Sequence, residues 1–291
     1  MRIFITGVNG YLGSSLARHW LTAGHAVCGS VRDALKAPPG LARVGVISLG
    51  GAVSESVFRD CQTVIHCAHD FSPGAVATNV EGTQGLFRAA RNAGVSRQIF
   101  LSSYSARPDA ATSYGRIKYN LECFFLERGA AVVRPGVVLG DGGLFGKSLR
   151  RLLKTRIVPL VHGGCDLLPV IGIRDLLAAM TVIAESSAAR AYNLFYAELV
   201  PLLTLAESIH RLAGRRGIYV DIPLAWAHAA LRIAGALKVR FPVGEENLRA
   251  LEANRVSIHE SSLPEFTGPW MSFDEALAEA VAAASAHLDR P

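Results

Sequence analysis

Three polar side chains in the middle of the chain have the types and spacing of a proton relay. Tyr114 and Lys118 are four residues apart in the run YGRIK, so on a helix they share one face. A tyrosine hydroxyl has an ordinary pKa near 10 and is a poor acid or base at pH 7, but a nearby cation lowers that pKa. Ser103, at the end of an apolar run, adds a hydroxyl that can hydrogen-bond a carbonyl or alcohol oxygen.

Taken alone, this spacing is also that of an ordinary pair on a helix surface. A second motif, at the start of the chain, favours the proton relay over a surface pair. Gly7, Gly10 and Gly13 follow the apolar, β-branched run Arg2–Thr6, and apolar residues at helical spacing continue to Trp20. Strand, glycine turn and helix together are typical of a dinucleotide site, where helix N–H groups bind the pyrophosphate. The alternative is a structural turn whose glycines serve only close packing.

With a dinucleotide bound, the positive charge of an oxidised nicotinamide would help Lys118 to stabilise the phenolate of Tyr114. The three side chains would then relay a proton during hydride transfer.

The residues at the end of the second expected strand indicate which dinucleotide is bound. Sites that select NAD place an acidic residue there, whereas this chain has Arg32, followed by Lys36. We therefore predict NADP, with NAD as the alternative, although Arg32 could also be a surface residue that stacks on adenine.

The elements that must position these residues alternate along the chain. Strands are predicted at Arg2–Thr6, His25–Val31, Val44–Leu49, Thr63–Ala68 and Gln98–Leu101, with a helix at Asn79–Asn92. Later elements are predicted as helices at Leu144–Lys154, Leu202–Leu212, Leu224–Leu237, Glu245–Asn254 and Phe273–Leu288, and as strands at Val158–Cys165 and Ile218–Pro223. The alternation predicts an α/β fold, a doubly wound parallel sheet with helices on both faces.

In a series of motifs the chain resembles the extended short-chain dehydrogenases/reductases, which are the NAD(P)-dependent epimerase/dehydratase superfamily. The motifs that carry the resemblance are TGVNGYLG at 6–13, VIHCA at 64–68, NVEGT at 79–83, GVSRQIFLSS at 94–103, YGRIK at 114–118, RPGVVLG at 134–140, PVIGIRDLLAAM at 169–180 and AYNLF at 191–195. The stretch at Arg32 looks most like that of the NADP-dependent dihydroflavonol-reductase type.

The resemblance implies a Rossmann domain at residues 1–165, with 166–198 returning to it. It also implies a smaller, mostly helical substrate lobe at 199–291, to which 137–165 contribute. Ser103, Tyr114 and Lys118 match the catalytic trio, with Tyr114 as acid/base. The cofactor-binding residues would be Gly7, Asn9, Gly10, Tyr11, Leu12, Gly13, Arg32, Lys36, Ala68, Tyr114, Lys118, Pro135 and Val137.

The chain departs from the family pattern at three places. Ser48 stands where an aspartate usually contacts adenine, which puts that contact in doubt. Val137 and Leu139 replace an asparagine and a tyrosine, and this removes an amide that many sugar-nucleotide enzymes place near substrate. Tyr104 and Ser105 follow the catalytic serine, where 4,6-dehydratases have an acidic pair.

We therefore expect an oxidoreductase that transfers hydride between NADPH and a carbonyl or alcohol carbon of a small organic substrate. The alternatives are an NAD(P)-dependent sugar-nucleotide epimerase and a non-catalytic NAD(P)-binding structural or regulatory subunit. Candidate substrate contacts, each of which packing alone would also explain, are His69, Asp70, Phe71, Tyr104, His162 and Arg240.

Bulk composition excludes several other classes of function. Of the 291 residues 50% are hydrophobic, and the net charge of +6 is spread along the chain, which does not favour nucleic acid. The five cysteines form no C-x-x-C pair, so we expect no metal site and no disulfide framework. No apolar stretch reaches the length of about 20 residues that a membrane span needs. We expect a cytoplasmic protein that acts without a membrane, and we consider a homodimer as its assembly.

Overall fold

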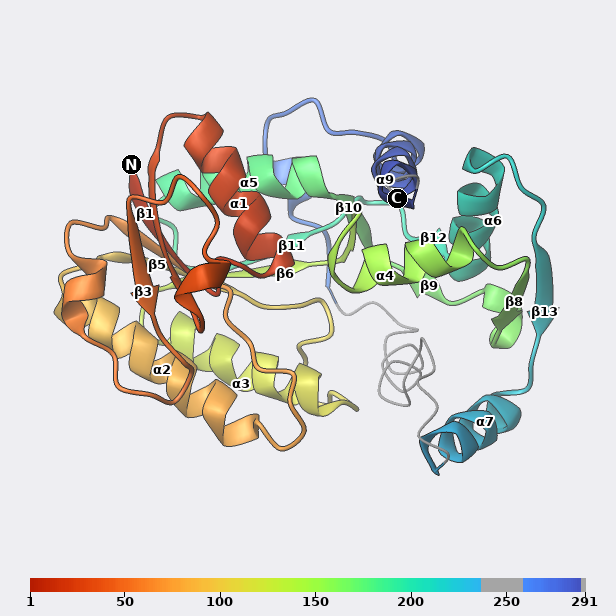
Figure 1. The fold of residues 1–291 in the computed structure, drawn as a ribbon, viewed down its shortest axis with the longest axis horizontal. Helices are drawn as coiled ribbons and strands as arrows, with labels where there is room; N and C mark the ends of the chain where they lie inside the picture. Colours follow the sequence, from red (N-terminus) through yellow and green to blue (C-terminus); the bar gives the residue numbers. More distant parts are fainter. Residues whose placement is uncertain (237–258, 289–291) are drawn as a thin grey trace. The chain divides into compact units, whose positions relative to one another are not determined.

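The structure is a computed structural model that describes residues 1–236 and 259–288 (Figure 1). Its contacts divide the chain into two compact units. The first unit comprises residues 1–109, 113–134 and 177–192, and the second comprises 110–112, 135–176 and the described residues from 193 on. Compactness does not say which unit binds cofactor or substrate, so the predicted functional domains remain a prediction.

The centre of the first unit is a seven-stranded sheet in the order β11-β6-β5-β4-β1-β2-β3. Its strands are β1 Arg2–Thr6, β2 Ala26–Val31, β3 Arg43–Val46, β4 Thr63–His66, β5 Arg97–Leu101, β6 Ala131–Pro135 and β11 Ala191–Leu194. The neighbouring pairs from β3 to β6 all run parallel. This order, which reverses between β1 and β4, confirms the predicted doubly wound fold.

Helices cover both faces of this sheet, α1 and α5 on one and α2 and α3 on the other (Figure 1). Their bounds are α1 Tyr11–Thr22, α2 Val76–Asn92, α3 Ser113–Leu126 and α5 Ile173–Glu185. Buried strands alternate their side chains between the two faces. Phe4 and Val64 thus join the buried cluster that includes Leu86 of α2. Phe100 packs with Phe125 of α3 in a second cluster.

The predicted bounds hold best where apolar periodicity is strong. The elements β1, α6 and α9 have the predicted bounds, whereas the third strand ends at Val46 rather than at Leu49. A turn replaces its last residues: the N–H of Gly51 donates to Ser48 O, and Gly50 has a φ of +81°. Helix α2 begins at Val76, three residues earlier than predicted.

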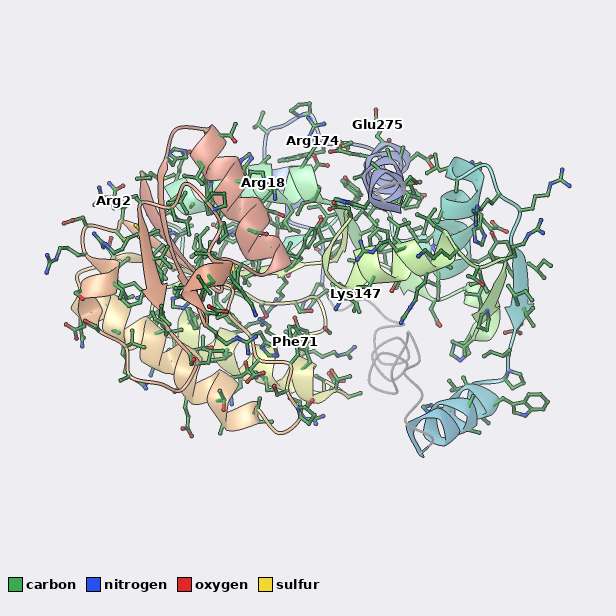
Figure 2. The ribbon with its side chains drawn as sticks, viewed as in Figure 1. Arg2, Arg18, Phe71, Lys147, Arg174 and Glu275 are labelled. Carbon is green, nitrogen blue, oxygen red and sulfur yellow. The ribbon has the colours of Figure 1, made fainter. Side chains whose placement is uncertain are left out.

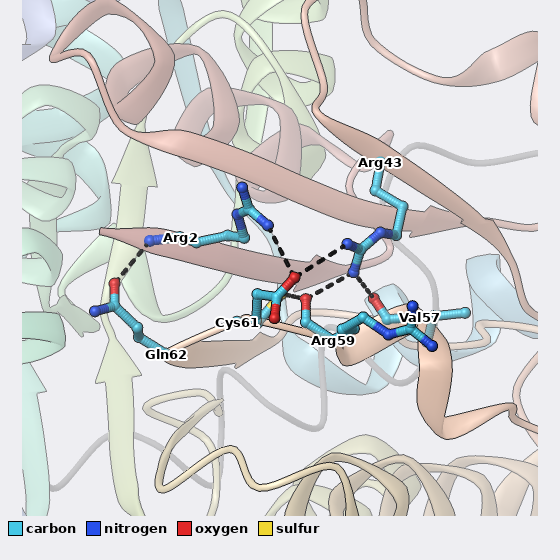
Figure 3. A network of polar contacts seen from close by, with 7 residues as sticks. Arg2, Arg43, Val57, Arg59, Cys61 and Gln62 are labelled. Atoms are coloured by element: carbon cyan, nitrogen blue, oxygen red, sulfur yellow. Dashed lines mark hydrogen bonds and ion pairs between the residues drawn. The ribbon is translucent and has the colours of Figure 1, made fainter.

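The turn that leads into β4 is held by two arginines, one from β1 and one from β3 (Figure 3). Arg2 and Arg43 both reach the carboxylate of Asp60, at 3.3 and 4.0 Å. Arg43 also donates to the carbonyl oxygens of Val57 and Arg59. Asp60 has a positive φ of +61°, which is uncommon for a residue other than glycine. These contacts fix the start of the strand whose other end reaches the candidate site.

The second unit is built from helices and short two-stranded sheets. The strand pairs are β7 Val137–Leu139 with β10 Val170–Gly172, β8 Ile157–Leu160 with β13 Ile218–Asp221, and β9 Leu167–Leu168 with β12 Val200–Pro201. The helices are α4 Gly143–Leu152, α6 Leu202–Leu212, α7 Leu224–Ala236 and α9 Phe273–Leu288. Helix α9 packs against α4, α6 and β10.

Single 3-10 turns complete both units, namely η1 Ala34–Lys36, η2 Glu55–Phe58, η3 His162–Gly164 and η4 Leu263–Glu265. The helix predicted at Glu245–Asn254 and the substrate candidate Arg240 lie outside the described residues. Within the described ranges, no helix has both the length and the apolar character that a membrane span requires. The same ranges contain no cluster of His, Cys, Asp or Glu side chains suited to a metal ion.

His66, the last residue of β4, is a buried histidine whose protonation opposes folding. Its Nε2 lies 2.8 Å from Gln98 Oε1, and the Gln98 amide donates to Phe87 O, so we assign the ring proton to Nε2. Nδ1 is buried and has no hydrogen-bond partner. A second proton would therefore be desolvated and unpaired. Burial lowers the pKa of His66 to about 4, against a partial rise from the bond to Gln98.

We expect this histidine to make stability depend on acidic pH. Between pH 6.5 and 4 the unfolded state binds the proton and the folded state does not, so stability falls as the pH is lowered. The shift from 6.5 to about 4 corresponds to about 3 kcal/mol. Urea unfolding of the protein and of His66→Phe at pH 7 and pH 4 measures it as the part of the pH dependence that the variant loses, since His69 also has a pKa lowered to about 4. Equal pH slopes in the two proteins would contradict the assignment.

Candidate functional site

The candidate site lies where the strand order reverses, at the carboxyl ends of β1 and β4, which is where open α/β sheets bind their ligands. Gly7 directly follows β1 and has a φ of +64°. A Cβ at Gly7 would lie 2.9 Å from the Cα of Ala68. Thr6 Oγ1 accepts hydrogen bonds from the N–H groups of Cys67 and Ala68, at 3.0 and 3.1 Å. The ends of the two strands are thereby held together.

The turn after β1 brings the start of α1 against the strand. A Cβ at Gly13 would lie 2.5 Å from Gly7 O, so only glycine allows this approach. Gly10 precedes the helix in an extended conformation and has no side chain that could cap it. The first turn of α1 contains no acidic residue. The first N–H groups of a helix have no acceptor within it. An uncapped, uncharged helix start of this kind suits an anion.

The other residues predicted for this motif lie in the same turn. Asn9 is exposed, while Tyr11 and Leu12 are half-buried at the start of α1. Ser30 of β2 supports the turn, because Ser30 O accepts from the N–H of Val8 at 3.0 Å and Ser30 Oγ accepts from the N–H of Gly7 at 3.3 Å.

Arg32 lies directly after β2, and its side chain is exposed. The neighbouring charges are already paired with each other. Asp33 accepts from the N–H of Leu35 at 3.1 Å and lies 3.8 Å from Lys36 Nζ. Asp33 thus caps η1 and lies next to Lys36, while Arg32 is the cation that directly follows β2 and interacts with the Asp70 carboxylate.

The structure brings Ser103, Tyr114 and Lys118 together at the end of β5. Ser103 hydrogen-bonds the side chain of Tyr114, and its Oγ lies 2.8 Å from Ser105 Oγ. The Lys118 side chain is buried, with 4% of its surface exposed, and Nζ donates to Leu101 O at 2.7 Å. Nζ lies 5.7 Å from the centroid of the Tyr114 ring. The predicted shared face of α3 is therefore present.

The pKa values differ from the expectation. Burial raises the pKa of Tyr114 to about 12, and the hydrogen bond to Ser103 opposes this rise only in part. Burial also lowers the pKa of Lys118 to about 8, against the attraction of Cys67 and Glu122. The expected lowering of the tyrosine pKa is not met by the chain by itself, because desolvation outweighs the hydrogen bond to Ser103. At pH 7 the Tyr114 phenol is protonated, which suits it to donate a proton.

The loop after β4 places two aromatic rings against Tyr114. The rings of His69 and Tyr114 meet edge to face at 5.1 Å, and those of Phe71 and Tyr114 are nearly parallel at 6.0 Å. Asn79 fixes the loop: its Oδ1 accepts from the N–H of Asp70, and its Nδ2 donates to the carbonyl oxygens of Asp70 and Ala75, each at 2.8 Å. Phe71, labelled in Figure 2, is 80% exposed.

Sequence reasoning missed several supporting residues of this site. Ser105 hydrogen-bonds Ser103, Cys67 lies near Lys118, and Thr6 joins the two strand ends. Asn79 was visible in the NVEGT motif, but an asparagine near a helix start is expected to cap it. Here α2 has already begun, and the side chain binds the loop before it. No local pattern distinguishes Thr6 or Cys67 from other buried residues.

The remaining predicted site residues are placed as follows. Tyr104 is buried directly after Ser103. Pro135, Val137 and His162 belong to the second unit. Within that unit the N–H of Val137 donates to Pro169 O at 2.7 Å, and His162 Nδ1 lies 2.9 Å from Asp166 Oδ2.

Comparisons with known proteins find similarity over parts of the chain. Residues 3–122 match the family described as NAD dependent epimerase/dehydratase family. Cinnamoyl-CoA reductase 1 of Oryza sativa subsp. japonica is 32% identical over 121 residues, which are 36% of this chain and 35% of the rice protein. A 3-diazoavenalumate denitrifying reductase of Streptomyces sp is 26% identical over 65% of this chain and 73% of its own. The chain thus spans about a third of the rice reductase.

Among solved structures, UDP-glucose 4-epimerase of Thermotoga maritima superposes with a TM-score of 0.77 at 17% identity, over 99% of this chain and 100% of its own. At this identity the likeness shows the shared fold. The family match covers residues 3–122, which is less than half of the chain, and it shows that this part is similar to the NAD dependent epimerase/dehydratase family.

Proposed function

Since residues 3–122 match the NAD dependent epimerase/dehydratase family, we propose that this chain transfers hydride between NADPH and a carbonyl or alcohol carbon of a small organic substrate. The observation that carries the proposal is the hydrogen bond between Ser103 and Tyr114, with the Lys118 ammonium one helical turn further along α3. A protonated phenol beside a second hydroxyl is equipped to hold and protonate one oxygen atom.

The glycine turn fits a dinucleotide, because Gly7 takes up a positive φ and Gly13 lets the uncapped start of α1 approach the end of β1. The N–H groups at the start of α1 would bind the pyrophosphate, and Ala68 borders the same turn. A bound cofactor would supply or accept the hydride. Asn9, Tyr11, Leu12, Pro135 and Val137 are proposed as further cofactor contacts.

The chain's own residues handle the proton. In the direction of reduction, Ser103 Oγ donates a hydrogen bond to the carbonyl oxygen, and Tyr114 gives that oxygen its phenolic proton. Lys118, already anchored by Leu101 O, stabilises the phenolate that results and would also bind the nicotinamide ribose. In the direction of oxidation the same groups act in reverse, and Tyr114 accepts the proton of the alcohol.

We propose NADP as the preferred cofactor on the basis of Arg32, and we expect Arg32→Ala to raise the Kd of NADPH by about 10-fold, a loss of about 1.4 kcal/mol. The Kd of NADH should stay unchanged, because NADH lacks the 2′-phosphate that the guanidinium would bind. Lys36→Ala should have the smaller effect, since Lys36 is paired with Asp33.

Fluorescence titration at low ionic strength, where charge interactions are least screened, measures both constants. Arg18→Ala is the matched control, because it removes the same charge from an exposed position of α1. Equal weakening of NADPH and NADH by Arg32→Ala would argue against a 2′-phosphate contact.

A panel of aldehydes, ketones and sugar nucleotides, followed by the absorbance of the reduced nicotinamide, tests the proposed activity. Net consumption of NADPH is the expected result. A sugar-nucleotide epimerase would convert its substrate without net consumption, and a structural or regulatory subunit would bind cofactor without turning over any member of the panel.

The wider assignments also remain proposals. We propose that residues 199–291, with 137–165, bind the substrate, and that His69, Phe71, Tyr104 and His162 contribute to substrate binding. A cytoplasmic location and a homodimer are proposed with them. We propose that the chain acts on its small-molecule substrate without nucleic acid or a membrane as partner.

A further inference from the structure

An exposed aromatic side chain lies against the proposed acid/base of this site. Single exposed apolar side chains are common and need no explanation, but Phe71 is 80% exposed while its ring lies nearly parallel to that of Tyr114, with centroids 6.0 Å apart. His69 meets both rings edge to face, at 4.7 Å from Phe71 and 5.1 Å from Tyr114. We call Phe71 and His69 the aromatic wall.

The wall is held in place before any ligand binds. Asn79, which is 1% exposed, makes three hydrogen bonds of 2.8 Å to the backbone on either side of Phe71. Asp70 Oδ1 accepts from the N–H of Ser72 at 2.9 Å and closes the turn around Phe71. A ring presented by a fixed loop loses less conformational entropy on binding than one on a mobile loop.

The wall is also uncharged at neutral pH. Burial, with a smaller contribution from Lys118, lowers the pKa of His69 to about 4 against the attraction of Asp70, so the imidazole is neutral. The Asp70 carboxylate between the two wall residues keeps its charge, but it accepts from the N–H of Ser72 and interacts with Arg32, and Lys118 is directed at Leu101 O. A neutral aromatic surface binds flat, uncharged π-systems better than saturated groups of the same size.

We propose that the aromatic wall binds a flat, conjugated group attached to the carbon whose oxygen Ser103 and Tyr114 hold, and that Phe71 is thereby a specificity-determining residue. This inference rests on the proposed function and adds to it the class of substrate, an aryl or otherwise conjugated carbonyl compound or carbinol. A saturated substituent would fill similar space but would gain no stacking against Phe71.

A matched pair of ketones tests the wall. Acetophenone and cyclohexyl methyl ketone share the methyl carbonyl group and differ in whether the ring is aromatic. With NADPH and the full chain, we expect acetophenone to have the lower KM by roughly 2- to 10-fold, the range that one aromatic contact supplies. Phe71→Leu, which keeps an apolar side chain, should remove this preference by raising the KM for acetophenone while kcat stays within about twofold.

Val182→Ala is the control variant, because Val182 is an exposed apolar residue of α5 in the same unit, and it should keep the preference. Binding of both ketones to the NADP-loaded protein is measured in parallel. Equal KM values for the two ketones in the natural protein, an unchanged preference in Phe71→Leu, or no binding of acetophenone would each overturn the aromatic wall. Selective binding of acetophenone without any NADPH consumption would instead overturn the proposed function and retain the wall.

Discussion

Tyr114→Phe is expected to lower kcat by about 10²- to 10⁴-fold, the usual contribution of a positioned general acid or base. The change removes only the hydroxyl, so the ring keeps its contacts with His69 and Phe71. Ser103 retains Ser105 Oγ at 2.8 Å as a partner, which limits the structural damage. The Kd of NADPH should therefore stay within about threefold of its original value, since threefold is only about 0.6 kcal/mol. Stopped-flow or steady-state kinetics, combined with a binding titration, separates the two effects.

Tyr119→Phe provides the matched control, because Tyr119 lies on the same helix and its hydroxyl contacts Cys123 rather than Ser103. It should keep nearly full activity. A Tyr114→Phe protein that retains more than a tenth of kcat would remove Tyr114 from the proton relay.

The pKa of Tyr114 also favours one direction of proton transfer. With a pKa of about 12 in the chain by itself, Tyr114 is an acid at pH 7 and needs additional positive charge before it becomes a base. Alcohol oxidation should consequently rise with pH more steeply than carbonyl reduction, because only oxidation requires the phenolate.

The fold was predictable because its signal is local and repeated. Strand β1 has the bounds that its apolar run predicts, and helices α6 and α9 have those that their helical spacing predicts. The third strand was predicted too long because Ile47 is buried like a strand residue, although its neighbours turn towards α2. A Cβ at Gly82 would lie 2.4 Å from Gly50 N, so this turn depends on a contact between residues far apart in the sequence.

Some features of the candidate site were likewise predictable from local sequence, and others were not. The spacing of Tyr114 and Lys118 predicts their shared face, and the order of the strands brings Ser103 to them. The sign of the tyrosine pKa shift was not predictable, because it depends on how much of the surrounding protein removes water from the hydroxyl. Likewise, the stacking of Phe71 on Tyr114 depends on the loop that Asn79 holds, and no spacing rule describes that loop.

Gly13→Ala is the second change with a large expected effect, and it tests whether the turn after β1 carries the cofactor. The new methyl group would lie 2.5 Å from Gly7 O and 3.0 Å from Val8 Cα. Both are backbone atoms, so no side chain can rotate away, and α1 must move from the strand. We expect a loss of about 1–3 kcal/mol in the free energy of unfolding, as for other overpacked sites. The Kd of NADPH should rise by at least about 10-fold, because the helix N–H groups move with α1.

Gly85→Ala separates this clash from the ordinary effect of alanine in a helix. Gly85 lies within α2, and a Cβ there would meet no atom within 4 Å. Alanine is favoured over glycine in a helix by about 0.5–1 kcal/mol, so Gly85→Ala should stabilise the protein and leave the Kd of NADPH unchanged. Helix propensity acts in the same direction at both positions, and opposite signs of the two stability changes would therefore isolate the contact with Gly7. If Gly13→Ala instead behaved like Gly85→Ala in both stability and NADPH binding, the close approach of α1 to β1 would not be what positions the cofactor.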